Sequence, residues 1–235
     1  RELSDAFSEQ ARALVEAGAD LLIVETCQDL LQVKTAVVAC LETLEAAKRD
    51  IPLMVSLTVE ATGTMLVGPD VAAALAALEP YPLFSIGLNC ATGPEGMVSH
   101  IRHLCRNYRG RVSCIPNAGI PTVSGGKTVY PLSPEAFAAQ LLPLVRDDGV
   151  SIAGGCCGTT PEHIRKLREA LDGVRPATRD VSPKASLSSL YQAVEIRQEI
   201  PPFLIGERCN ASGSKKFREL LLADDLDGAV RVALD

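Results

Sequence analysis

Short apolar strands alternate with amphipathic helices along most of this chain. Five apolar runs have the length of buried strands, and segments with helical periodicity separate them. The expected strands cover residues 21–24, 53–59, 84–89, 111–116 and 150–153. Strands that are apolar throughout and flanked by helices are typical of a parallel sheet. The chain is therefore predicted to be an α/β protein built from βα units.

Helices are expected at residues 3–15, 29–48, 69–77, 94–105, 134–144 and 161–171. The last four are predicted to carry a proline at their first position, where its missing N–H costs nothing. The repeat of about 34 residues is the size of one βα unit in an eight-fold barrel, which needs about 250 residues in all. Two interpretations stay open at this point. The chain forms either an open doubly wound domain or an incomplete (β/α)8 TIM-type barrel with about its last five βα units.

The composition changes after residue 172. Residues 173–202 are rich in Pro, Ser, Arg and Lys, which is typical of a linker. A new apolar strand at 203–205 and a helix at about 215–222 are predicted to begin a second α/β domain. The expected organisation is a barrel domain at 1–172, a linker at 173–202 and the start of another domain at 203–235.

Charge and hydropathy exclude several classes of protein. The chain has 23 basic and 29 acidic side chains, a net charge of −6, which argues against a nucleic-acid binder. No apolar run reaches the roughly 18 residues that span a bilayer, and no signal-peptide core is present. A cytoplasmic protein without a membrane partner is expected. The 8 cysteines lack a closely spaced framework, which favours reduced thiols or a metal over disulfides.

The strongest chemical signal is the adjacent pair Cys156 and Cys157, which follows a strand and is flanked by glycines. Cys90 follows another strand two units earlier. The carboxyl ends of parallel strands converge on one functional face, so the three thiols can meet. Three thiolates with one open position describe a catalytic zinc site. The alternatives are a redox pair, or two structural cysteines with an unrelated third.

The other candidate ligands carry weaker signals. Cys27, Cys40, Cys105, Cys114 and Cys209 have no paired neighbour, and most are expected to be small core residues, although Cys114 could approach the site. His100 and His103 have helical spacing but no further ligands nearby, so surface or interface positions are favoured. His163 lies in the first turn of its expected helix, where a neutral role or a capping role is expected. Gly125-Gly126 lacks the context of a phosphate loop.

Three segments carry a resemblance to a known family: Gly87–Cys90, Ile115–Gly119 and Gly154–Pro161. Together they resemble the homocysteine S-methyltransferase family, in the version found in cobalamin-dependent methionine synthases, over about residues 1–172. Residues 205–214 resemble the opening strand of the methyltetrahydrofolate-binding domain that follows it in those enzymes.

The resemblance implies a (β/α)8 barrel in which Cys90, Cys156 and Cys157 hold zinc and are the catalytic residues. The thiol of homocysteine would be activated on the zinc and methylated by methylcobalamin to give methionine. The methyl group would come from 5-methyltetrahydrofolate, with Asn210 as a folate-binding residue. Glu25 is implied to bind the amino group of homocysteine, with helix capping as its alternative. Asn117 is expected to approach the zinc or the substrate, with turn formation as its alternative.

The chain also departs from the family. The first three βα units and a cobalamin-binding segment are missing, so we expect an internal part of a larger enzyme whose cobalamin-binding domain is its partner. Two other functions stay open. One is a free-standing homocysteine or thiol S-methyltransferase with a sulfonium or betaine donor, against which the folate-like tail argues. The other is a non-catalytic zinc-binding module, which needs a fourth protein ligand.

Overall fold

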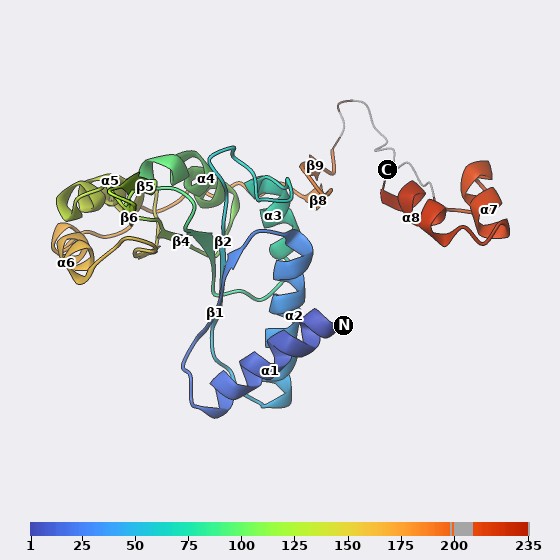
Figure 1. Ribbon diagram of the computed structural model, residues 1–235, viewed down its shortest axis with the longest axis horizontal. Coiled ribbons are helices and arrows are strands. Elements are labelled where there is room, and N and C mark those ends of the chain that lie inside the picture. The colour runs from blue at the N-terminus through green and yellow to red at the C-terminus, as the bar shows by residue number, and fades with distance from the viewer. Residues whose placement is uncertain (198, 200–208, 235) are drawn as a thin grey trace. The chain divides into compact units, whose positions relative to one another are not determined.

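A parallel sheet forms the centre of the first unit of the chain, Arg1–Ile196 (Figure 1). The computed structural model describes residues 1–197, 199 and 209–234. The strands of the sheet are β1 (Leu22–Cys27), β2 (Leu53–Leu57), β3 (Ser85–Asn89), β4 (Arg111–Ile115) and β7 (Ile152–Ala153). They pair in chain order, so β1 and β7 lie at the two ends of the sheet within the described residues. The predicted α/β fold with a parallel sheet is confirmed.

Six helices accompany the sheet within this unit. They are α1 (Glu2–Glu16), α2 (Leu30–Ala46), α3 (Val71–Leu78), α4 (Pro94–Asn107), α5 (Pro134–Arg146) and α6 (Pro161–Ala170). Among these six helices, those that follow one another along the chain are in contact. Right-handed crossovers between strands in sequential order place all connecting helices on one face of a sheet. The structure is therefore singly wound, unlike the doubly wound alternative.

The two faces of the sheet differ in chemistry. Val55, Ile86 and Val112 are paired across β2, β3 and β4 and are fully buried in the core under the helices. The opposite face, here called the polar face, carries Ser56 and Ser113 on either side of Gly87. Both serine hydroxyls are buried without a hydrogen-bond partner among the described residues. The centre of the polar face therefore carries small and polar side chains.

Local signals place most helix starts. Pro94, Pro134 and Pro161 each lie at the first position of a helix, as predicted. The expectation for Pro69 is wrong, because α3 begins two residues later behind Asp70. The Asp70 carboxylate accepts a hydrogen bond from the Ala73 N–H at 2.7 Å and is the cap of that helix.

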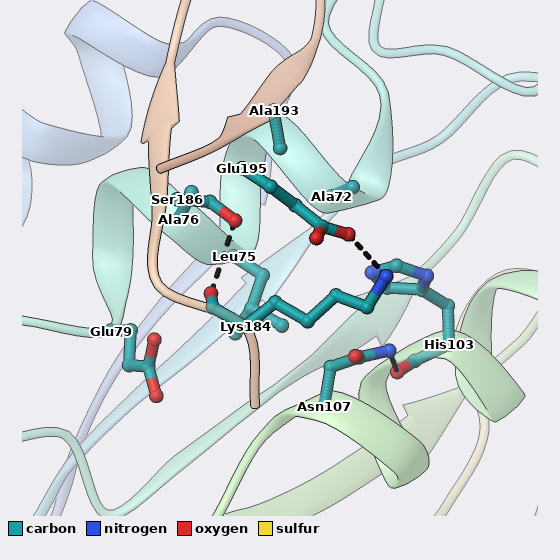
Figure 2. A pocket seen from close by; sticks show the side chains of 10 residues that line it. All are labelled: Ala72, Leu75, Ala76, Glu79, His103, Asn107, Lys184, Ser186, Ala193 and Glu195. Atoms are coloured by element: carbon teal, nitrogen blue, oxygen red, sulfur yellow. Dashed lines mark hydrogen bonds and ion pairs between the residues drawn. The ribbon is translucent and has the colours of Figure 1, made fainter. Parts of the chain in front are cut away.

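The segment 173–202, expected to be a linker, contains an antiparallel hairpin of β8 (Ser186–Ser188) and β9 (Ala193–Glu195). The hairpin packs on α3, and the Asp70 N–H donates to the Tyr191 carbonyl at 3.0 Å. Figure 2 shows the cavity of about 350 Å³ beneath it, where the Lys184–Glu195 ion pair faces His103 of α4. Residues up to Ile196 therefore belong to the first unit.

The second unit, Arg197–Asp235, contains α7 (Lys215–Leu222) and α8 (Leu226–Leu234), which contact each other. The helix predicted at 215–222 is confirmed. The strand predicted at 203–205 lies outside the described residues. No helix in the described part of either unit is both long and apolar enough to cross a bilayer.

Candidate metal centre

Cys90 lies in a sharp turn directly after β3. Cys90 and the following Ala91 have φ angles of +63° and +54°, in the left-handed region that non-glycine residues rarely adopt. The Thr92 N–H donates to the Cys90 carbonyl at 2.7 Å and closes the turn. Consecutive left-handed residues are costly and tend to persist where the surrounding structure enforces them at functional sites. The turn holds the Cys90 side chain at the carboxyl end of the sheet.

Cys156 and Cys157 lie in the loop between β7 and α6. The Cys156 N–H donates to the Pro116 carbonyl at 2.8 Å, and the Cys157 carbonyl accepts from the Ala118 N–H at 2.9 Å. These bonds join the loop to the segment after β4. Because the backbone here is no longer a strand, two adjacent side chains can point toward one place.

The structure brings the three predicted thiols together. The Cys90 and Cys157 sulfurs are 3.7 Å apart, and the Cys156 and Cys157 sulfurs are 3.9 Å apart. All three sulfurs lie within 4.8 Å of one another, and all three cysteines are free. Tetrahedral zinc with bonds of about 2.3 Å to sulfur sets neighbouring sulfurs about 3.8 Å apart. The measured separations therefore match the edge of a tetrahedral zinc site.

Two asparagines at neighbouring strand ends support the thiols. Asn117 accepts a hydrogen bond from the Cys157 N–H at 3.0 Å through its side-chain oxygen. Asn89 donates from Nδ2 to the Cys156 sulfur at 3.8 Å. Asn117 was predicted as a site residue and does contact the cluster. Asn89 was not singled out, although its position directly before Cys90 in the motif was a usable signal.

Burial and neighbouring charge perturb the acids of this site. Burial raises the pKa of the Cys156 thiol to about 11, while the hydrogen bond from Asn89 acts in the opposite direction. Desolvation raises the pKa of Tyr130, and the nearby Cys157 thiol adds to this shift. Tyr130 follows the exposed hairpin of β5 (Thr122–Ser124) and β6 (Lys127–Val129). Its ring lies so close to Gly158 that a Cβ there would be 2.1 Å from Tyr130 Cγ.

The comparison with protein families agrees with this arrangement. Residues 1–171 match the family model described as homocysteine S-methyltransferase. The chain belongs to this family. All three clustered thiols lie within the matched residues.

Curated relatives of this methyltransferase-family chain are named methionine synthase. The protein from Mycobacterium tuberculosis (strain ATCC 25618 / H37Rv) is 46% identical over 233 residues, which are 99% of this chain and 20% of the relative. The protein from Mycobacterium leprae (strain TN) is 46% identical over 240 residues, covering 100% of this chain and 20% of the relative. The chain thus spans about a fifth of the length of these relatives.

A solved structure shares the fold of the family domain. The apo crystal structure of the homocysteine methyltransferase MmuM from Escherichia coli is 28% identical and superimposes with a TM-score of 0.52. The match covers 71% of this chain and 57% of that chain. The parallel sheet and its helices are therefore shared with a homocysteine methyltransferase.

Glu25 was expected at the end of a strand predicted at residues 21–24, but it lies within β1. The strand continues past Glu25 to Cys27, with an irregularity in its pairing between Val24 and Cys27. Thr26 has a φ of +60° at this irregularity. The exposed Glu25 side chain lines a cavity of about 260 Å³ at the β1 edge, together with Ile23. Thr26, the residue after Glu25, donates from its backbone N–H to the Asn89 side-chain oxygen at 3.1 Å.

The remaining candidate ligands lie apart from the thiol cluster. Cys27, Cys40, Cys105 and Cys114 are buried, as expected for core residues, whereas Cys209 is exposed. Cys114 packs in the core under the helices and does not join the cluster. Among the described residues, neither His100 nor His103 forms part of a metal-ligating group.

His163 acts as a structural residue at the start of α6. Its Nδ1 lies 2.9 Å from the Thr160 hydroxyl and accepts from the Thr160 N–H at 3.2 Å, which completes a capping box. Its Nε2 lies 3.0 Å from the Leu132 carbonyl. Since Nδ1 is an acceptor, Nε2 carries the proton and donates to that carbonyl. The predicted capping role is confirmed.

Asn210, the predicted folate-binding residue, lies in the second unit. Its side-chain oxygen accepts a hydrogen bond from the Ser212 N–H at 2.9 Å and shapes a turn before α7. A role in folate binding stays a prediction.

Proposed function

We propose that this chain is the homocysteine-methylating part of a cobalamin-dependent methionine synthase. The observation that carries the proposal is the triangle of sulfurs from Cys90, Cys156 and Cys157, with separations of 3.7 and 3.9 Å along two of its edges. Family membership and relatives named methionine synthase support the same conclusion.

The donor set fits zinc. Thiolates are soft ligands that select zinc over magnesium or calcium, and no fourth His, Cys, Asp or Glu joins the three sulfurs among the described residues. A closed structural site would need such a fourth ligand. The arrangement therefore favours a catalytic site with an open position over a non-catalytic zinc module.

Zinc bound here would hold the thiol of homocysteine as a thiolate at neutral pH. The three cysteine thiolates carry more negative charge than the ion neutralises, which keeps the fourth sulfur electron-rich. Methylcobalamin, held by another part of the enzyme, would supply the methyl group for that sulfur. The product would be methionine.

The chain's own residues would bind and orient the substrate. Glu25 is proposed to receive the amino group of homocysteine, because its exposed side chain lies in the irregular part of β1, next to Thr26, which contacts Asn89. Asn117 is proposed to face the substrate while its oxygen fixes the Cys157 backbone.

The sheet is proposed to be part of a (β/α)8 barrel. The sheet is singly wound. Among the described residues, β1 and β7 each pair on one side only, and the buried Ser56, Ser85 and Ser113 hydroxyls have no hydrogen-bond partner. These features support an inner face completed by further strands. We further propose a barrel portion at 1–172, a connecting segment at 173–202 whose residues up to Ile196 pack with the first unit, and the start of a folate-binding domain at 203–235. In this assignment Asn210 would contact 5-methyltetrahydrofolate, the source of the methyl group. The cobalamin-binding domain would be a partner elsewhere in the same protein.

The test is the coordination of zinc before and after homocysteine is added. X-ray absorption at the zinc edge counts sulfur ligands directly, and we expect three cysteine sulfurs alone and four sulfurs with homocysteine. Serine, which lacks a thiol, is the control amino acid and should leave the spectrum unchanged. A site that already holds four protein ligands, or gains none, refutes the proposal.

The methyl donor is tested separately. Methionine formation is expected with methylcobalamin, and not with betaine or a methylsulfonium compound. Product from either of the latter donors alone would identify the free-standing type of methyltransferase instead.

A further inference from the structure

The Asn89 carboxamide connects the thiol cluster with strand β1. Asn89 is the last residue of β3, lies on the polar face and is fully buried. Its Oδ1 accepts from the Thr26 N–H at 3.1 Å, and its Nδ2 donates to the Thr26 hydroxyl at 2.9 Å. The same Nδ2 donates to the Cys156 sulfur at 3.8 Å. One side chain therefore spans two strand ends and a cluster cysteine that are distant in sequence.

The orientation of this carboxamide follows from its partners. Oxygen and nitrogen of an asparagine side chain are placed by their hydrogen bonds, and the Thr26 N–H needs an acceptor. Oδ1 must therefore face Thr26 N, which leaves Nδ2 directed toward Cys156. In a flipped carboxamide, Nδ2 would face the Thr26 N–H, so that two donors would meet. Oδ1 would then face the Cys156 thiolate, so that two acceptors would meet.

We propose that Asn89 is a positioning residue for the metal centre, whose N–H donation holds and partly neutralises the Cys156 thiolate. The inference rests on the proposed function, because it concerns the same site. Groups that donate hydrogen bonds to metal ligands fix their orientation and tune the metal, and their loss typically costs about 10–100-fold in metal affinity. Because Thr26 follows Glu25, Asn89 also links the proposed substrate-binding strand end to a metal ligand.

Asn89→Asp removes the N–H donation to Cys156 and adds a negative charge beside the thiolates. A carboxylate still accepts from the Thr26 N–H, and the Thr26 hydroxyl can donate to it, but the donor facing Cys156 is lost. In the full chain we expect zinc affinity, measured by competition with a chromophoric chelator, to fall about 10–100-fold. With cobalt in place of zinc, the sulfur-to-cobalt charge-transfer band should move to longer wavelength, because the sulfur lone pairs are no longer stabilised.

Asn107→Asp is the matched control. It makes the same change of charge on α4, where Asn107 donates to the His103 carbonyl at 2.8 Å and lines the cavity under the hairpin. This variant should keep both the zinc affinity and the band position. Thr26→Val, which removes the hydroxyl but leaves the donation to Cys156, should also keep the band position.

A second measurement does not depend on how a variant folds. In the unmodified chain loaded with an NMR-active cadmium isotope, a scalar coupling between cadmium and the Asn89 Nδ2 protons is expected, since it passes through the hydrogen bond to sulfur. Its absence in a loaded protein overturns the inference, and so does an Asn89→Asp protein with unchanged affinity and band position. If Asn89→Asp has a lower zinc affinity and a weaker charge-transfer band at an unchanged wavelength, Asn89 has a purely structural role. That result would also overturn the inference. Failure of the unmodified chain to bind zinc at all would instead refute the proposed function.

Discussion

Substitution of Gly87 by alanine should destabilise the sheet at the base of the thiol cluster. Gly87 pairs with Ser113 across β3 and β4. A Cβ at Gly87 would lie 1.9 Å from Ser113 Oγ, 2.1 Å from its carbonyl oxygen and 2.6 Å from its carbonyl carbon. The hydroxyl can rotate away, but the two backbone atoms can move only if the strands separate. The clash therefore weakens the backbone hydrogen bonds between β3 and β4.

The magnitude follows from opposing effects. Overpacking costs about 1–3 kcal/mol, occasionally more, and a clash with backbone belongs at the upper end of that range. The lower entropy of the unfolded alanine variant offsets only about 0.4–1 kcal/mol. We expect a net loss of about 2–3 kcal/mol, and weaker zinc binding as well, because Cys90 follows three residues later. With a denaturant slope near 2 kcal/mol per molar, the urea midpoint should fall by roughly 1–1.5 M.

Gly154→Ala is the matched control, since a Cβ there meets only Ile115 side-chain atoms at 3.8 and 3.9 Å. Gly154 also lacks a positive φ. This variant should be as stable as the unmodified chain, or about 0.4–1 kcal/mol more stable. Urea unfolding followed by circular dichroism compares the two proteins. Equal midpoints for Gly87→Ala and Gly154→Ala would show that the close approach of β3 and β4 is not a constraint, and would refute the reasoning.

Three further outcomes are expected. Cys156→Ala should lose its zinc on dialysis, whereas Cys40→Ala, which removes a buried thiol of α2, should retain it. Metal analysis of both proteins measures this, and stoichiometric zinc in Cys156→Ala would contradict the assignment of ligands. Asp70→Ala should lower the free energy of unfolding by about 1 kcal/mol, because the Ala73 N–H loses its cap at 2.7 Å; an unchanged thermal midpoint would speak against the cap. Burial lowers the pKa of His103, and the Asp70 charge opposes this shift in part. On acidification the unfolded chain therefore binds a proton at His103 at a higher pH than the folded chain does. The free energy of unfolding should fall as the pH drops below about 6.5. His103→Gln should flatten that pH dependence, and identical unfolding curves against pH would contradict it.

Much of the fold could be predicted because its signals are local. The caps at Asp29 and Ser133 and the prolines at the starts of α4, α5 and α6 act within one turn of helix, so the sequence carries them directly. The error at Pro69 has the same origin. Asp70 offers a competing cap one residue later, and the bond that it makes to Ala73 decided the start of α3.

The candidate site could be predicted in part. Cys90, Cys156 and Cys157 were found because parallel strand ends converge, which is a property of the fold class. The contact between Asn89 and Thr26 was missed, because the bond joins residues 63 positions apart and depends on a left-handed residue in β1. No local pattern reports such a contact.

The sequence by itself determined the order of the five strands of the parallel sheet and of the helices between them, the reduced state expected of the thiols and the identity of the clustered cysteines. Hydrophobic period, capping chemistry and residue type are properties of short segments, and they survive without tertiary contacts. Only the tertiary structure decided that the sheet is singly wound, that the hairpin of β8 and β9 packs on α3, and that Asn89 faces the Cys156 sulfur. Each of these depends on surfaces and hydrogen bonds between distant segments, whose geometry exists only once the chain is packed.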